Sequence, residues 1–124
     1  MASRFHVLVV EDEPLVLDVI QATLEDSYRV SSAGTVEEAN AILRTSHVDV
    51  ALIDNVLPDG RGADVAIVAE EVGVTIIKMT GYSSESVDQD ASGRPHLFKP
   101  FALNTLLSTV ESALHDHQWS EPAR

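Results

Sequence analysis

Residues 48–54 of the chain are Val48-Asp49-Val50-Ala51-Leu52-Ile53-Asp54. The run is short, mostly apolar and rich in β-branched residues, which predicts a β-strand. It ends at Asp54, and the turn-forming residues 57–62 follow soon after. Asp54 is therefore expected at the C-terminal end of a strand.

Four other short runs of the same kind are predicted to be strands, at residues 5–10, 28–33, 74–79 and 95–98. Apolar residues recur at helical spacing between them, in residues 14–26, 35–43, 63–72 and 103–114. Thr35 with Glu38 forms a capping-box pattern, and Gly73 is placed to end the third helix. The polar residues 83–93 predict at most a short or loosely packed fourth helix.

This alternation of strands and helices predicts an α/β fold, a doubly wound parallel sheet with helices on both faces. The 124 residues, 44% of them apolar, suit a single domain. We expect that domain to span residues 1–124, with a core at about 5–117 and a tail at 118–124. We expect no separate output domain.

The formal net charge of −12 should repel nucleic acid and anionic membranes, so direct binding to either is not expected. The chain has no cysteine, which excludes disulfides and thiol chemistry. Neither a signal-like segment nor a membrane-spanning apolar stretch is evident. We therefore expect a cytoplasmic protein.

Polar residues follow four of the predicted strands. In a parallel sheet Glu11, Asp12, Asp54, Thr80 and Lys99 would share one edge, where sites form in folds of this class. Crowded carboxylates repel unless a cation neutralises them, and an all-oxygen cluster suits Mg²⁺. A carboxylate can attack phosphorus while a lysine and a hydroxyl contact the transferring group. The cluster predicts Mg²⁺-dependent phosphoryl transfer, with Asp54 as the nucleophile.

Four motifs, each closing a predicted strand, resemble the receiver domains of response regulators. They are Val9-Val10-Glu11-Asp12-Glu13, Ile53-Asp54 with Pro58 and Gly62, Met79-Thr80-Gly81, and Phe98-Lys99-Pro100-Phe101. Together they span nearly the whole chain. The Thr80-Gly81-Tyr82 run with a weak fourth helix is similar to a subset of stand-alone, single-domain response regulators. The resemblance implies a flavodoxin-like receiver fold with strand order 2-1-3-4-5, counting strands along the chain.

The same resemblance implies roles for the acidic residues. Asp54 would be the phosphoacceptor. Asp12 and Asp54 would bind Mg²⁺ together with the backbone carbonyl of Val56, and Glu11 would act mainly through water.

The resemblance also implies roles around the phosphoryl group. Thr80 and Lys99 would contact it, and a cis peptide bond would precede Pro100. In the family, the threonine hydroxyl moves toward the phosphoryl group, and an aromatic ring three residues before the lysine rotates inward after it. His96 stands there in this chain and is either a packing residue or a pH-sensitive switch. Tyr82 is bulky for its position, and we hypothesise that it slows dephosphorylation.

The resulting interpretation is a two-component signalling protein, phosphorylated by a histidine kinase or a histidine phosphotransfer protein. A downstream protein partner would read its state, or the phosphoryl group would be passed onward. It would catalyse only its own phosphorylation and dephosphorylation, and so is not expected to be an enzyme with an external substrate.

Three other functions are compatible with a chain of this fold class. One is a phosphorylation-independent adaptor with the same fold. A second is an Asp-nucleophile phosphohydrolase, which would need an acid where Val56 stands. A flavodoxin-like cofactor binder would need a phosphate-binding loop after the first strand, and none is evident.

Overall fold

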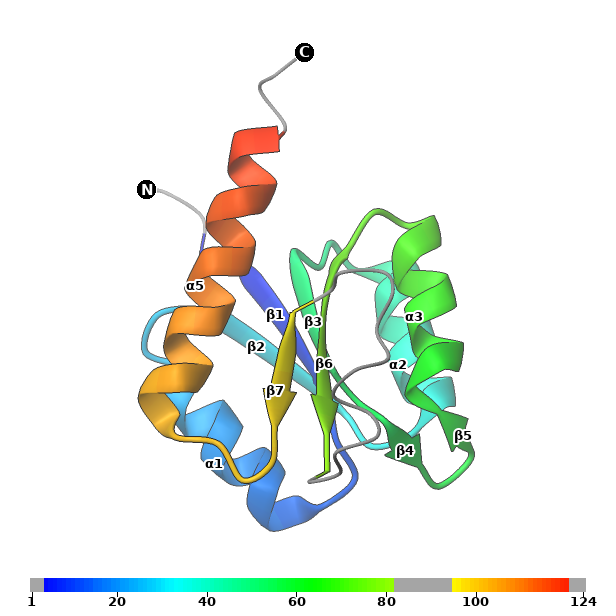
Figure 1. The fold of residues 1–124 in the computed structure, drawn as a ribbon. Helices are drawn as coiled ribbons and strands as arrows, with labels where there is room; N and C mark the ends of the chain where they lie inside the picture. Colours follow the sequence, from blue (N-terminus) through cyan, green and yellow to red (C-terminus); the bar gives the residue numbers. More distant parts are fainter. Residues whose placement is uncertain (1–3, 82–94, 121–124) are drawn as a thin grey trace.

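A computed structural model describes residues 4–81 and 95–120, with side chains through residue 115. Its main sheet has five parallel strands in the order β2-β1-β3-β6-β7 (Figure 1). The strands are β1 (His6–Val10), β2 (Arg29–Ala33), β3 (Val50–Asp54), β6 (Thr75–Thr80) and β7 (His96–Phe98). The predicted α/β class and the strand order 2-1-3-4-5 are confirmed.

Helices cover both faces of this sheet, with α1 and α5 on one side and α2 and α3 on the other (Figure 1). They are α1 (Pro14–Leu24), α2 (Val36–Thr45), α3 (Gly62–Glu71) and α5 (Leu103–Ser120). None of these helices, within residues 4–81 and 95–120, is long and apolar enough to cross a membrane. The weak helix predicted at residues 83–93 and the Tyr82 side chain lie outside the described residues.

The last helix is longer than its apolar pattern predicts. It continues to Ser120, three residues into the predicted tail at 118–124. Residues 115–120 contain no glycine or proline, and the next proline is Pro122. Adding a residue to an existing helix needs no new nucleus, so the helix can continue beyond its last leucine, Leu114.

Strands β1 and β3 are buried along their whole length. All five residues of β1 and all five of β3 are buried. Side chains alternate between faces, so Leu8 and Ile53 join the core under α2 and α3, whereas Val9 and Leu52 join the core under α1 and α5. The residues at the ends of β1 and β3 therefore project from a backbone packed on both sides.

The helix ends follow local sequence signals, with one difference. Thr35 Oγ1 accepts a hydrogen bond from Glu38 N at 3.1 Å, as the capping pattern predicts. Glu38 Oε1 accepts from Gly34 N, at 2.8 Å, instead of from Thr35 N. Gly73 ends α3 with a φ of 81°, a conformation that favours glycine.

The turn-forming residues after β3 make a small hairpin that the sequence alone did not reveal. Strands β4 (Val56–Leu57) and β5 (Gly60–Arg61) pair in antiparallel fashion and are separate from the main sheet. Gly62 N donates to Asn55 O at 2.9 Å and closes the base of the hairpin. Leu57 is buried in the core under α2 and α3.

Candidate functional site

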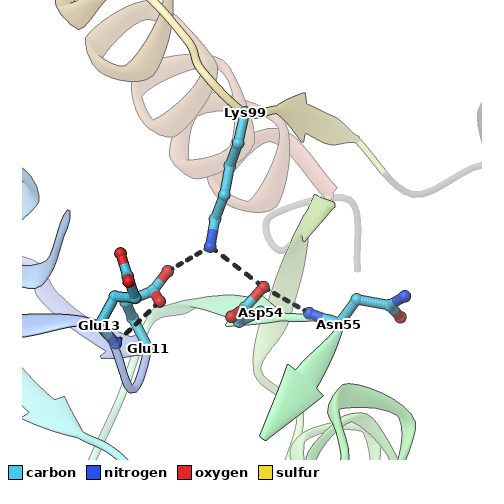
Figure 2. A network of polar contacts seen from close by, with 5 residues as sticks. All are labelled: Glu11, Glu13, Asp54, Asn55 and Lys99. Carbon is cyan, nitrogen blue, oxygen red and sulfur yellow. Dashed lines mark hydrogen bonds and ion pairs between the residues drawn. The ribbon is translucent and has the colours of Figure 1, made fainter. Parts of the chain in front are cut away.

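The polar residues at the C-terminal strand ends lie at one edge of the sheet. Glu11 follows β1, Asp54 ends β3, Thr80 ends β6 and Lys99 follows β7. Parallel pairing of these strands carries their ends to a common edge, as the alternating pattern predicts. Figure 2 shows the Lys99 side chain descending toward Glu11 and Asp54.

Lys99 bridges two buried carboxylates. Its Nζ lies 2.6 Å from Glu11 Oε1 and 3.2 Å from Asp54 Oδ1 (Figure 2). Burial alone would lower the pKa of Lys99, but the hydrogen bond to Glu11 and the charge of Asp54 outweigh it and raise the pKa. The ammonium group is therefore held in its charged form.

Asp54 is in a crowded, largely dry position. It is 8% exposed, and its Oδ1 accepts a hydrogen bond from Asn55 N at 2.8 Å. Burial and the charge of Glu11 raise the pKa of Asp54, while Lys99 and the Asn55 N–H act in the opposite direction. The carboxylate thus depends on nearby positive charge to stay ionised.

The acids at this edge fit a hard divalent cation. Glu11, Asp12 and Asp54 each offer a carboxylate oxygen, and these oxygens lie within 4.8 Å of one another. Glu11 is 1% exposed and is oriented by Glu13 N, which donates to its Oε2 at 3.1 Å, whereas Asp12 faces solvent. Oxygen donors, one of them exposed, are what Mg²⁺ with retained waters requires. The ligand role of the Val56 carbonyl remains a prediction.

The hydroxyl of Thr80 stands out because it lacks a partner. Thr80 is buried, and its Oγ1 makes no hydrogen bond within residues 4–81 and 95–120. A buried hydroxyl without a partner carries a desolvation cost of roughly 1–3 kcal/mol. The site would recover that cost by binding a group that accepts a hydrogen bond.

The rings of His96 and Phe98 on β7 lie close together. His96 stacks on Phe98, with ring centroids 5.6 Å apart and an interplanar angle of 5°. In the ladder between β6 and β7, Thr80 pairs with Phe98 and Lys78 pairs with His96. Phe98 is therefore the ring in register with Thr80, and the switch role of His96 stays a prediction.

The site has two further backbone features, at Pro100 and at Asn55. The bond between Lys99 and Pro100 is cis, as the resemblance implies. Asn55 was missed as a site residue, because its backbone N–H rather than its side chain contacts Asp54. Nothing in the residue types alone signals such a contact.

An apolar groove of about 520 Å³ opens beside Lys99. Its apolar walls include Leu15, Val16 and Val19 of α1 together with Phe101 and Leu103. Leu15 is 78% exposed, and because Val19 and Leu103 are exposed beside it, the three form a contiguous apolar patch rather than a single exposed side chain. The groove gives the polar site an apolar border open to solvent.

Known proteins place this arrangement in context. Residues 7–111 match the family described as the response regulator receiver domain. The chain is 31% identical to the KDP operon transcriptional regulatory protein KdpE of Escherichia coli over 117 residues, which are 90% of this chain and 52% of that protein. It is 29% identical to the transcriptional regulatory protein PdtaR of Mycobacterium tuberculosis over 115 residues, 88% of this chain and 56% of that protein.

The chain thus spans about half the length of these curated relatives. Among solved structures, a CheY-like response regulator receiver domain protein from Methanospirillum hungatei is similar, with a TM-score of 0.85 and 28% identity. That match covers 95% of this chain and 99% of the other. The family match, the strand order and the acidic cluster agree, and the chain belongs to the response regulator receiver domain family.

Proposed function

We propose that Asp54 accepts a phosphoryl group from a phosphohistidine in a Mg²⁺-dependent reaction, in a cytoplasmic two-component pathway. The observation that carries this proposal is the bridge from Lys99 to Glu11 and Asp54. It holds the proposed nucleophile Asp54, the ammonium group of Lys99 and the carboxylate of Glu11 at one edge of the sheet. Thr80 ends the neighbouring strand, and its hydroxyl has no hydrogen-bond partner among the described residues.

The chemistry would be a direct transfer. An oxygen of Asp54 attacks phosphorus, an O–P bond forms, the N–P bond of the phosphohistidine breaks, and its electron pair returns to the imidazole. Mg²⁺, when bound by Asp12, Asp54 and the Val56 carbonyl, supplies neutralisation of the negative charge, and Glu11 would act through water. Atoms and charge balance without any further reactant.

Lys99 and Thr80 would respond to the new group. Lys99 Nζ, which lies 3.2 Å from Asp54 Oδ1, would contact a phosphoryl oxygen once Asp54 carries the acyl phosphate. The Thr80 hydroxyl, which has no partner within residues 4–81 and 95–120, would donate a hydrogen bond to another phosphoryl oxygen. These two contacts would favour the phosphorylated conformation and supply the signal.

The donor is proposed to be a histidine kinase or a histidine phosphotransfer protein. The apolar groove that includes Leu15, Val19 and Phe101 borders Lys99, so a protein docked there would place a histidine near Asp54. A downstream protein would then read the phosphorylated state, or the phosphoryl group would move to another histidine. The receiver domain itself, with a formal net charge of −12, is not proposed to contact nucleic acid or a membrane directly.

The test is phosphorylation by a small phosphodonor such as acetyl phosphate, with and without Mg²⁺, followed by intact mass. We expect one phosphoryl adduct that requires Mg²⁺ and is absent in Asp54→Asn. Asp18→Asn, which alters an exposed acid on α1, is the matched control and should retain the adduct. A folded protein without any adduct would support the adaptor alternative, and continuous phosphate release over many turnovers would support the phosphohydrolase.

A further inference from the structure

Asp59 links two segments that are distant in the sequence. It lies at the tip of the β4–β5 hairpin, and both of its carboxylate oxygens accept hydrogen bonds from α2. Oδ1 accepts from Val36 N at 2.7 Å, and Oδ2 accepts from Glu37 N at 3.1 Å. Of the first three N–H groups of α2, only that of Glu38 donates to the side chain of the N-cap residue Thr35. Two of the first three N–H groups of α2 are thus bound by the hairpin.

The hairpin tip also packs against the same helix. A Cβ added to Gly60 would lie 3.1 Å from Val36 Cγ2 and 2.8 Å from Asp64 Oδ2. The backbone of the tip is therefore in close contact with the first residue of α2 and with the first turn of α3. This close approach makes the contact between hairpin and α2 more than a single pair of hydrogen bonds.

The attachment matters because the hairpin has few other supports. Strand β4 is two residues long and pairs with β5, outside the main sheet. The Val56 side chain is 68% exposed and so cannot anchor it. The described anchors are buried Leu57, the Asn55–Gly62 hydrogen bond at the base, the hydrogen bond from Arg61 N to Asp64 Oδ2 at 3.0 Å, and Asp59 at the tip.

We propose that Asp59 is a positioning residue for the Mg²⁺ site. By tying the tip of the hairpin to α2, it fixes where β4 holds the backbone carbonyl of Val56. This inference rests on the proposed function, which makes that carbonyl a metal ligand. Linkage requires the reverse effect as well, so Mg²⁺ binding stabilises the contact between Asp59 and the first turn of α2.

A carboxylate suits this position for two reasons. Its two oxygens accept one N–H each, and its negative charge lies at the positive end of the α2 dipole. Asparagine at the same position has a single acceptor oxygen, so it can keep one of the two bonds. Alanine keeps neither, and the three residue types give a graded series.

The test compares the Mg²⁺ affinity of the wild type, Asp59→Asn, Asp59→Ala and Thr35→Ala, measured from amide NMR shifts at the site. Thr35→Ala is the matched control, because it removes a cap from the same helix end without touching the hairpin. Loss of an outer-shell support lowers metal affinity by roughly 10–100-fold in metalloproteins, and we expect about tenfold for Asp59→Ala. Asp59→Asn should fall between, and Thr35→Ala should bind as the wild type does.

Hydrogen exchange gives a second readout. Mg²⁺ should slow exchange of the Val36 and Glu37 amides in the wild type, and this protection should vanish in Asp59→Ala. The Glu38 amide, bound by Thr35, is the internal reference.

The outcomes separate the two ideas. A wild type that binds no Mg²⁺ contradicts the proposed function itself. A wild type that binds, with an equally tight Asp59→Ala, overturns the role of Asp59, as does an equal loss in Thr35→Ala. If Asp59→Ala does not fold, the comparison of Asp59→Asn with the wild type decides.

Discussion

Gly62 lies directly against the backbone carbonyl of Asp54, so close that a Cβ on Gly62 would be 2.2 Å from that oxygen. The same Cβ would be 3.1 Å from Ile53 Cγ2. No side chain fits at position 62 unless the end of β3 or the start of α3 moves. The backbone of Asp54, at the end of β3, is therefore packed directly against Gly62 at the start of α3.

Gly62→Ala should for this reason damage both stability and phosphorylation. Overpacking of a tight site costs typically 1–3 kcal/mol, and we expect a loss at the upper end of about that range, measured by urea unfolding. Gly34→Ala is the comparison, because the nearest atom to its added Cβ would be 3.9 Å away. Equal free energies of unfolding for the two variants would contradict this prediction, because they would mean that β3 or α3 shifts at little cost.

Lys99→Met should destabilise the metal-free protein through Glu11. That carboxylate is buried, and Lys99 Nζ neutralises it at 2.6 Å. Removing one partner of a buried ion pair costs about 3–5 kcal/mol. A second substitution, Glu11→Gln, removes the orphaned charge, so the double variant should regain much of the loss in urea unfolding. Additive losses would mean that the two groups do not interact.

Mg²⁺ should raise the melting temperature of the wild type. A ligand present at 100 times its Kd stabilises the native state by about 2.7 kcal/mol. Asp12→Ala should abolish this shift at little cost to metal-free stability, because Asp12 is exposed. Asp18→Ala removes an equally exposed acid from α1 and should leave the shift unchanged. A shift that survives in Asp12→Ala would place the ion elsewhere.

The cap formed by Asp59 should be lost in acid. The hydrogen bond from Val36 N, with a smaller part from Glu37 N, holds the pKa of Asp59 below 3.8. A carboxyl with a lowered folded pKa binds fewer protons when folded, so its contribution is complete above about pH 3.8 and fades as the pH falls through the folded value. The stability gap between wild type and Asp59→Asn, measured by urea unfolding, should therefore be constant near neutrality and close in acid. A gap that persists at the lowest pH would contradict a charged cap.

The predictable parts of the fold are those with local causes. Strands β1 and β3 are apolar runs bounded by acids and turns, and Thr35 caps α2 through a residue three positions away. The edge shared by Glu11, Asp54 and Lys99 follows from parallel pairing alone. Such features depend on periodicity and spacing, which the sequence displays directly.

The rest depends on contacts between distant segments. Pro58-Asp59-Gly60 predicts a turn, but its residue types do not say that the turn reaches the first residues of α2. Likewise the sequence places Lys99 at this edge of the sheet, but its residue type does not say that its Nζ lies between Glu11 and Asp54. Continuation of α5 to Ser120 needs no apolar signal, so the pattern of leucines ended too early.

The bridge between Lys99 and Glu11 joins positions 88 residues apart. Glu11 follows β1 and Lys99 follows β7. The ion pair can therefore form only after these two strands, the first and last along the chain, have both joined the sheet. A partly synthesised chain, or an N-terminal fragment that ends before β7, would contain Asp54 without Lys99. Competence to receive a signal would therefore report that the domain has finished folding.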